Sequence, residues 1–199
     1  LNTIFFIFLM TVSCAQEKES VKYANSITIN DLKDLLSIYS SDDFEGRQTG
    51  TQGDRTAANF LREFYINNQI EPALNTIDYF QPYQLNLPGE MYTRNYTFPE
   101  KLRAYNRYAE GVNFVDTQNV ASIIKGEIYP DSYLIITGHL DHVGIDGDEV
   151  YNGADDNGSG TVSILEIAQA FQEAVEDGVR PKRSVVFLHV SGEEEGLLG

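Results

Sequence analysis

The sequence of 199 residues is long enough for one domain with a substantial core, and 42% apolar residues with 12% aromatics is a globular composition. Acidic residues outnumber basic ones by 30 to 14, which gives a formal net charge of −16 at pH 7. A field of this sign repels phosphate backbones, so nucleic acid is excluded as an expected partner. The acidic excess is typical of a solvated extracellular surface, and some of its carboxylates remain open to a role as metal ligands.

The chain opens with an apolar run of signal-peptide length, LNTIFFIFLMTVSCAQ, which is too short to span a membrane. We therefore predict a signal segment over residues 1–14 and one folded domain from residue 15 onward. The only cysteine, Cys14, lies in a context similar to a bacterial lipobox, which predicts lipidation and membrane attachment through Cys14. Ordinary cleavage after Ala15 is the alternative, because Ser13 and Ala15 are both small. Either interpretation predicts an exported protein, held in the cell envelope or secreted, without an intramolecular disulfide.

Two amphipathic helices are predicted in the first third of the chain. From Asn30 to Ser40, apolar residues recur at helical spacing, and Asn30 is the predicted N-cap. The stretch EGRQTGTQGD, residues 45–54, is dense in glycine and polar residues and predicts a loop. A second helix then runs from about Ala57 to Asn68. The segment 71–116 has many aromatic residues and no clear period, which indicates irregular structure with short strands.

The second half of the sequence predicts a strand–helix–strand unit. Two β-branched and apolar runs, Asn119–Lys125 and Tyr133–Thr137, are typical of buried strands. Apolar residues at helical spacing predict a helix over Ser159–Val175, and Gly178 ends it. A further strand follows over Ser184–Val190. The strands on either side of the helix are expected to lie parallel in one sheet, with their carboxyl ends at the same edge.

Three clusters of histidine and acidic residues fall at that edge: GHLDHVG (138–144), NGADDNGSG (152–160) and SGEEEGLLG (191–199). Ligands of open α/β sheets bind outside the carboxyl ends of the strands. A mixture of imidazole and carboxylates suits Zn²⁺ better than Ca²⁺ or Mg²⁺, which prefer shells of oxygen alone. The clusters therefore predict a zinc site.

Each cluster also has a structural alternative. A lone histidine such as His139 is more often a hydrogen-bonded side chain than a ligand, and Asp155 and Asp156 before a helix are typical of capping. Three consecutive glutamates are most often a solvated run. Together, however, like charges held at one edge without a cation would repel one another. An EF-hand is excluded, because Val150 stands where a loop beginning at Asp146 needs an oxygen ligand.

The ordered set GHLDHVG, NGADDNGSG, KRSVVFL and EEEGLLG resembles the core signature of the co-catalytic dinuclear zinc exopeptidases, metallopeptidase family twenty-eight, which includes secreted bacterial leucine aminopeptidases. The resemblance covers residues 119–199, and EGRQTGTQG resembles the N-terminal helix region of the family more loosely. It implies an α/β fold, a three-layer sandwich with a mixed, mainly parallel central sheet, and two Zn²⁺ ions. Residues 15–199 would then be the N-terminal, incomplete part of a peptidase domain.

The resemblance also implies roles for single residues. His139 matches a metal ligand, and Asp141 matches the carboxylate that orients its imidazole. Asp156 rather than Asp155 matches the aspartate that bridges the two metals, and the peptide bond that follows it, Asp156–Asn157, is expected to be cis. In the last motif, Glu193 matches the general base and Glu194 a ligand of the second metal. Glu195 is an ordinary neighbour.

The family completes its metal shells with a further aspartate and a further histidine, so two more ligands are expected beyond Gly199 and this chain alone is expected to be inactive. The resemblance implies an aminopeptidase that hydrolyses N-terminal residues of peptides by means of a hydroxide bridging the two Zn²⁺ ions, with Glu193 as the base. Three alternatives stay open at this point. They are a carboxypeptidase of the same family, a glutaminyl-cyclase-like transferase, and a metal-free binding module of the same fold.

Overall fold

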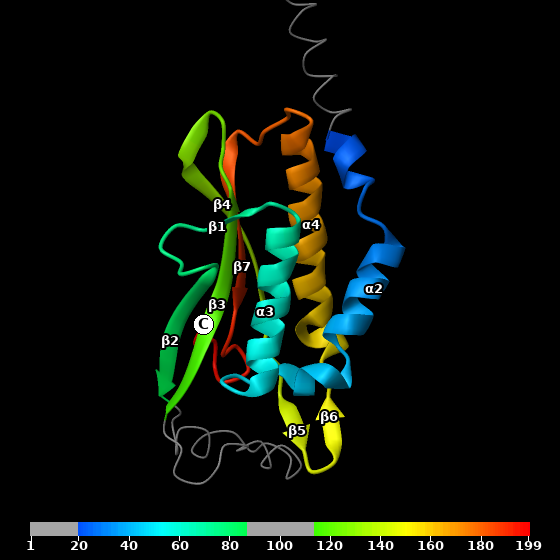
Figure 1. Ribbon diagram of the computed structural model, residues 1–199, viewed down its shortest axis with the longest axis vertical. Helices are drawn as coiled ribbons and strands as arrows, with labels where there is room; N and C mark the ends of the chain where they lie inside the picture. The colour runs from blue at the N-terminus through cyan, green and yellow to red at the C-terminus, as the bar shows by residue number, and fades with distance from the viewer. Residues whose placement is uncertain (1–19, 87–113) are drawn as a thin grey trace, which may run out of the picture.

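The computed structural model describes residues 20–86 and 114–199, and within them one mixed sheet packs against helices that lie on one of its faces (Figure 1). The predicted signal segment with Cys14 lies outside the described residues, so the lipidation stays a prediction. None of the described helices combines the length and the apolar content that crossing a bilayer requires.

Helix α2 spans Ile29–Tyr39, as the periodicity predicts, but its N-cap is Thr28 and not Asn30. Thr28 has an extended backbone, and its Oγ1 accepts a hydrogen bond from the backbone N of Asp31 at 3.2 Å. Threonine and asparagine can both cap a helix, and the residue that holds the extended conformation before the first turn takes the role. The predicted N-cap was therefore wrong by two residues.

We expect Thr28→Ala to lower the free energy of unfolding by about 1 kcal/mol, because the amide of Asp31 loses its acceptor. Asn30→Ala is the matched control, since Asn30 lies within the first turn and replacement by a better helix former costs nothing there. Urea unfolding of both variants measures the difference. A larger loss for Asn30→Ala would return the cap to Asn30.

Helix α3 spans Gln52–Asn67 and begins earlier than predicted. Its N-cap, Thr51, and its first turn fall within the predicted loop 45–54, whose first residues also belong to a short 3₁₀ segment, Asp42–Arg47. The glycine-rich composition hid a helix start, because Thr51 followed three residues later by Asp54 is itself a capping signal. The loop prediction is therefore confirmed for residues 48–51 and wrong for residues 45–47 and 52–54, which belong to the 3₁₀ segment and to α3.

The large sheet has five strands in the order β1-β3-β7-β4, with β2 paired to the other end of β3. Their bounds are Glu71–Pro72 (β1), Phe80–Asn86 (β2), Phe114–Ile124 (β3), Tyr129–His139 (β4) and Arg183–Val190 (β7). Strand β4 pairs parallel with β7, and helix α4, Ser159–Glu176, connects them. The strand–helix–strand unit and the α/β class are confirmed. Within the described residues the other pairings are antiparallel.

A small hairpin of β5, Gly144–Asp146, and β6, Glu149–Tyr151, lies between β4 and α4 at the lower end of the molecule in Figure 1. The residue pattern does not predict this hairpin. Strands of three residues are too short to show an alternating pattern.

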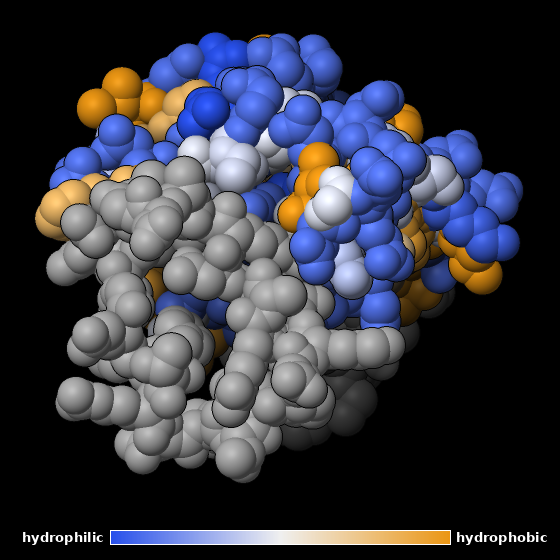
Figure 2. All heavy atoms as spheres, turned by 90° about the horizontal axis from the view of Figure 1, so that it is seen from below, coloured by the Kyte–Doolittle hydropathy of each residue, from blue (hydrophilic) through white to orange (hydrophobic). Residues whose placement is uncertain are grey.

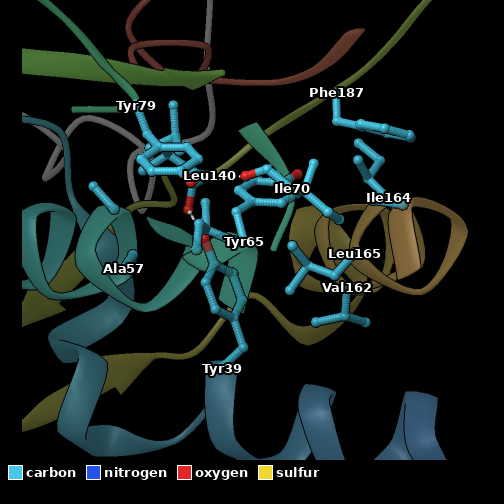
Figure 3. Close-up of a cluster of buried hydrophobic side chains, with 14 of the residues drawn as sticks. Tyr39, Ala57, Tyr65, Ile70, Tyr79, Leu140, Val162, Ile164, Leu165 and Phe187 are labelled. Atoms are coloured by element: carbon cyan, nitrogen blue, oxygen red, sulfur yellow. Dashed lines mark hydrogen bonds between the residues drawn. The ribbon is translucent and has the colours of Figure 1, made fainter. Parts of the chain in front are cut away.

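The core fills the space between the sheet and helices α2, α3 and α4 (Figure 3). Its largest fully buried side chains include Tyr39 of α2, Tyr65 of α3, Leu165 of α4 and Phe187 of β7. Leu140, the residue after β4, is also fully buried in this cluster. The core therefore holds the carboxyl end of β4 directly, and it is from this end that the predicted metal ligands extend.

Candidate metal centre

The carboxyl ends of β4 and β7 lie side by side, because the parallel register pairs His139 with Val190. The three predicted clusters leave the sheet here: one at the end of β4, one at the start of α4 and one after β7. Figure 2 views the molecule from this end, and the described surface on it is mainly hydrophilic. The juxtaposition predicted from the strand–helix–strand topology is thus present.

Three side chains meet at this edge in a geometry that could hold a cation. His139, Asp156 and Glu194 each present one ligand atom, and these atoms all lie within 4.8 Å of one another. The Nε2 atom of His139 lies 3.0 Å from Oδ1 of Asp156. These are the three residues that the family resemblance implies as ligands, and Asp156, not Asp155, is the member of its pair that joins them.

His139 is buried, and contacts between its Nδ1 atom and Asp141 fix the orientation of its ring. Its Nδ1 lies 3.0 Å from the backbone carbonyl of Asp141 and 3.6 Å from the Asp141 carboxylate, which leaves Nε2 facing Asp156. Burial lowers the pKa of His139, but the hydrogen bond and negative charge of Asp141 outweigh it and raise the pKa to about 9. A ligating imidazole needs this kind of backing, because the partner of one nitrogen determines which nitrogen is offered to the metal.

Asp141 is fully buried and connects several parts of the site. Its carboxylate accepts a hydrogen bond from Thr49 Oγ1 at 2.9 Å and from the backbone amides of Glu193 and Glu194, each at 3.3 Å. The residue implied as the orienting carboxylate therefore also holds the segment that carries both glutamates. The sequence did not indicate the contact between Asp141 and the glutamate segment, because every residue except proline has a backbone N–H donor and the residue type does not show where it binds.

The aspartate-bearing loop depends on a glycine. Gly153 has φ +52°, and a Cβ there would lie 2.5 Å from the backbone oxygen of Asp156 and from the ring of His142. Only glycine fits both the left-handed backbone and the close approach. The Asp156–Asn157 peptide bond is cis, which confirms that expectation.

Glu193 and Glu194 follow β7 and contact different partners. A carboxylate oxygen of Glu193 lies 3.8 Å from His139 Nε2, whereas Glu194 Oε1 lies 2.7 Å from His142 Nδ1. Burial raises the pKa of Glu193, and the neighbouring carboxylates add to this effect while His139 opposes it. A carboxylate with a raised pKa is suited to accept a proton near neutral pH. The specific roles given to these glutamates stay predictions.

Arg47 is a structural part of the site that sequence reasoning missed. Its guanidinium is fully buried and donates to the carbonyls of Tyr39, Leu140, Asn152 and Gly153 at 2.8–2.9 Å. Leu140 lies between His139 and Asp141, and Gly153 lies in the loop that leads to Asp156. One side chain therefore joins the two loops that carry the histidine and the aspartate. The only signal was the loose resemblance of EGRQTGTQG to the N-terminal region of the family.

The donor set fits zinc. An imidazole nitrogen and two carboxylate oxygens are typical zinc ligands, and three protein ligands without cysteine are more typical of catalytic than of structural zinc. The neighbouring carboxylates of Glu193 and Asp141 add negative charge that a cation would compensate. Arg47 is a buried cation beside these loops, but its guanidinium hydrogen bonds within the described residues go to carbonyl oxygens.

The fold and this site define an α/β protein that gathers an imidazole and carboxylates at the carboxyl ends of two parallel strands. Residues 119–199 match the family model described as peptidase family M28. This is the family whose core signature the motifs of the chain resemble. The matched segment contains the five predicted catalytic and metal-binding residues, His139, Asp141, Asp156, Glu193 and Glu194, and not the predicted lipidation site, Cys14.

The curated relatives that match the chain include both an aminopeptidase and a probable carboxypeptidase. It is 34% identical over 116 residues to aminopeptidase NAALADL1 of Rattus norvegicus, a match that covers 56% of this chain and 14% of that protein. It is also 34% identical over 92 residues to the probable glutamate carboxypeptidase VP8 of Zea mays, which covers 46% of this chain and 12% of that protein. The chain thus spans a small part of the length of these relatives.

Solved structures of low sequence identity share the fold. Glutaminyl cyclase of Fimbriiglobus ruber superimposes with a TM-score of 0.57 at 14% identity, covering 83% of this chain and 46% of that one. A Zn-dependent exopeptidase of Parabacteroides distasonis gives a TM-score of 0.52 at 13% identity, with coverage of 83% and 47%. The fold is therefore one that zinc exopeptidases and glutaminyl cyclases have in common.

Proposed function

We propose that the whole protein is a zinc-dependent exopeptidase that removes N-terminal residues from peptides. The observation that carries the proposal is the meeting of His139, Asp156 and Glu194 within 4.8 Å, with the Glu193 carboxylate 3.8 Å from the same imidazole nitrogen. Metal-assisted hydrolysis needs a set of metal ligands and, next to it, a carboxylate that is not a ligand and can act as the base.

His139, Asp156 and Glu194 would hold zinc, and Asp156 would be shared between two ions. Bound zinc supplies Lewis-acid polarisation of the scissile carbonyl and makes the attacking water more acidic. Glu193, whose pKa is raised by burial and by its acidic neighbours, accepts the proton of that water and then transfers it to the leaving amine. Asp141 keeps the imidazole of His139 oriented and, through two backbone amides, keeps the glutamates in place.

The choice of an N-terminal substrate rests on charge and on one relative. A site lined by carboxylates in a protein of net charge −16 favours a free α-amino group over a free carboxylate. The NAALADL1 relative is named an aminopeptidase, which supports the same choice. Carboxypeptidase activity is the rival outcome, because the VP8 relative is named a probable glutamate carboxypeptidase.

Three peptides separate these activities in the whole protein loaded with zinc: one with free termini, one N-acetylated with a free carboxyl end, and one with N-terminal glutamine. We expect the first to lose its N-terminal residue, the second to resist, and two zinc ions per chain by elemental analysis. Removal of the C-terminal residue from the acetylated peptide would instead make the protein a carboxypeptidase. Formation of pyroglutamate would make it a cyclase, and no zinc with no turnover would leave a binding module.

A further inference from the structure

A second buried carboxylate, Asp54, lies in the first turn of α3 and is fully buried. Its oxygens accept hydrogen bonds from Thr117 Oγ1 at 2.7 Å, Ser191 Oγ at 2.9 Å and the backbone N of Gly50 at 3.0 Å. Burial raises the pKa of Asp54 to about 6, although these three donors lower it. A buried carboxylate that accepts hydrogen bonds from uncharged hydroxyl and amide groups, without a paired cation, lowers the stability of the fold. Its contacts therefore indicate what it contributes.

The contact with Ser191 is the one that links α3 to the metal centre. Ser191 is the first residue after β7, is fully buried, and lies two positions before Glu193. Each of its polar atoms is bound: its N–H donates to Asn119 Oδ1 at 3.0 Å, its carbonyl accepts from the hydroxyl of Tyr83, and its hydroxyl donates to Asp54. Residues of β2, β3 and α3 thus fix one point on the chain.

That point determines where the two glutamates can lie. Gly192, with φ +80°, turns the chain between Ser191 and Glu193, and a glycine there leaves the segment free to rotate unless both sides are held. The far side is held by the amides of Glu193 and Glu194 on Asp141. The near side is held by Ser191 and, across 137 residues of sequence, by Asp54.

We propose that Asp54 is a positioning residue for the Glu193–Glu194 segment, acting through the hydroxyl of Ser191. The catalytic part of this role rests on the proposed function, but the hydrogen bonds that position the segment involve only residues of this chain. Asp54 lies outside the segment that matches the family model, so nothing in that match assigns it a role.

The competing explanation is helix capping, since Asp54 is an acidic residue in the first turn of α3 and its carboxylate binds Gly50 N. Thr51→Ala is the matched control, because it removes the N-cap of the same helix and does not touch Ser191. Asp54→Ala removes the carboxylate, and Ser191→Ala removes only the hydroxyl that it holds. Asp54→Asn is the conservative variant, which keeps the shape and one acceptor.

In the whole zinc-loaded protein, we expect Asp54→Ala and Ser191→Ala each to lower kcat about 100-fold with KM within about twofold, because a misplacement of about 1 Å is enough for such a loss. The double variant should be no worse than Asp54→Ala, since both remove one link. Asp54→Asn should recover part of the loss, and Thr51→Ala should leave kcat unchanged.

Amide hydrogen exchange supplies a readout that needs neither zinc nor substrate. The amides of Glu193 and Glu194 should exchange faster in Asp54→Ala and Ser191→Ala than in the wild type, and at the wild-type rate in Thr51→Ala. Unchanged exchange and kcat in Ser191→Ala, a variant that removes one oxygen atom, would overturn the proposal even if Asp54→Ala fails to fold. If these variants exchange faster than the wild type but the wild-type protein hydrolyses no peptide, the positioning role stands and the exopeptidase proposal is refuted.

Discussion

Glu193→Gln is expected to lower kcat of the whole protein by about 10²–10⁴-fold, the loss typical of a missing general base, while zinc stays bound and KM changes little. The amide keeps the size and polarity of the side chain but cannot accept the proton of the attacking water. Steady-state kinetics together with zinc analysis of the same preparation measure both quantities. The result depends on the position of Glu193, 3.8 Å from His139 Nε2 and outside the group of three ligand atoms.

The neighbouring glutamates are the controls for this prediction. Glu194→Gln should weaken zinc binding, because Glu194 is one of the three grouped side chains, so added zinc should restore part of the activity. Glu195→Gln should change neither activity nor zinc content. Loss of zinc from the Glu193 variant with full retention in the Glu194 variant would exchange their roles. Full activity of all three variants would refute the metallopeptidase proposal.

Arg47→Met is expected to lower the free energy of unfolding by about 3–5 kcal/mol, because each buried carbonyl left without a donor costs about 1–3 kcal/mol. Two of the four carbonyls keep another donor: Leu140 retains the hydroxyl of Tyr39, and Gly153 retains the amide of Gly158. The loss therefore falls mainly on the carbonyls of Tyr39 and Asn152. Urea unfolding at unchanged m-value is the measurement.

Arg55→Met is the matched control, since Arg55 is exposed on α3 and its guanidinium bonds Gly50 O at 3.1 Å. A loss below about 0.5 kcal/mol is expected for this variant. Arg47→Lys should fall between the two, because an ammonium keeps the charge but cannot reach four carbonyls with planar geometry. Equal losses for Arg47→Met and Arg55→Met would show that the buried guanidinium contributes no more than an exposed one.

The second half of the chain could be predicted well from the sequence, for a physical reason. Strand β7 and helix α4 each bury apolar side chains at alternating or helical spacing, so the residue pattern itself records their environment. Strand β4 forms where it was predicted, but the expected burial was wrong, because Tyr133, Leu134 and Ile135 are exposed. The position of His139, Asp156 and Glu194 at one edge then followed from topology. The first third was less accurate: Thr28 and not Asn30 caps α2, and α3 begins inside a predicted loop.

The supporting residues could not be predicted in the same way. Arg47 and Asp54 are buried charges in a glycine-rich stretch, and polar residues in such a stretch ordinarily indicate solvent exposure. Their hydrogen-bond partners are carbonyl and hydroxyl groups of residues that lie about 100 residues further along the chain. No local pattern encodes a partner at that distance. The role of Ser191 was hidden for the same reason, since its neighbours Asn119 and Thr117 belong to another strand.

The anchoring of the site by Arg47 and Asp54 has a consequence for how the protein folds. The contacts of these two residues span 93 to 137 residues of sequence for the links to Leu140, Asn152, Gly153 and Ser191. Contacts of such separation form late, because the loop-closure entropy must be overcome first. During synthesis the segment 47–54 emerges long before its partners and must wait for them. A chain that has closed these contacts has completed most of its long-range topology, so zinc capture should report a finished fold and not an intermediate.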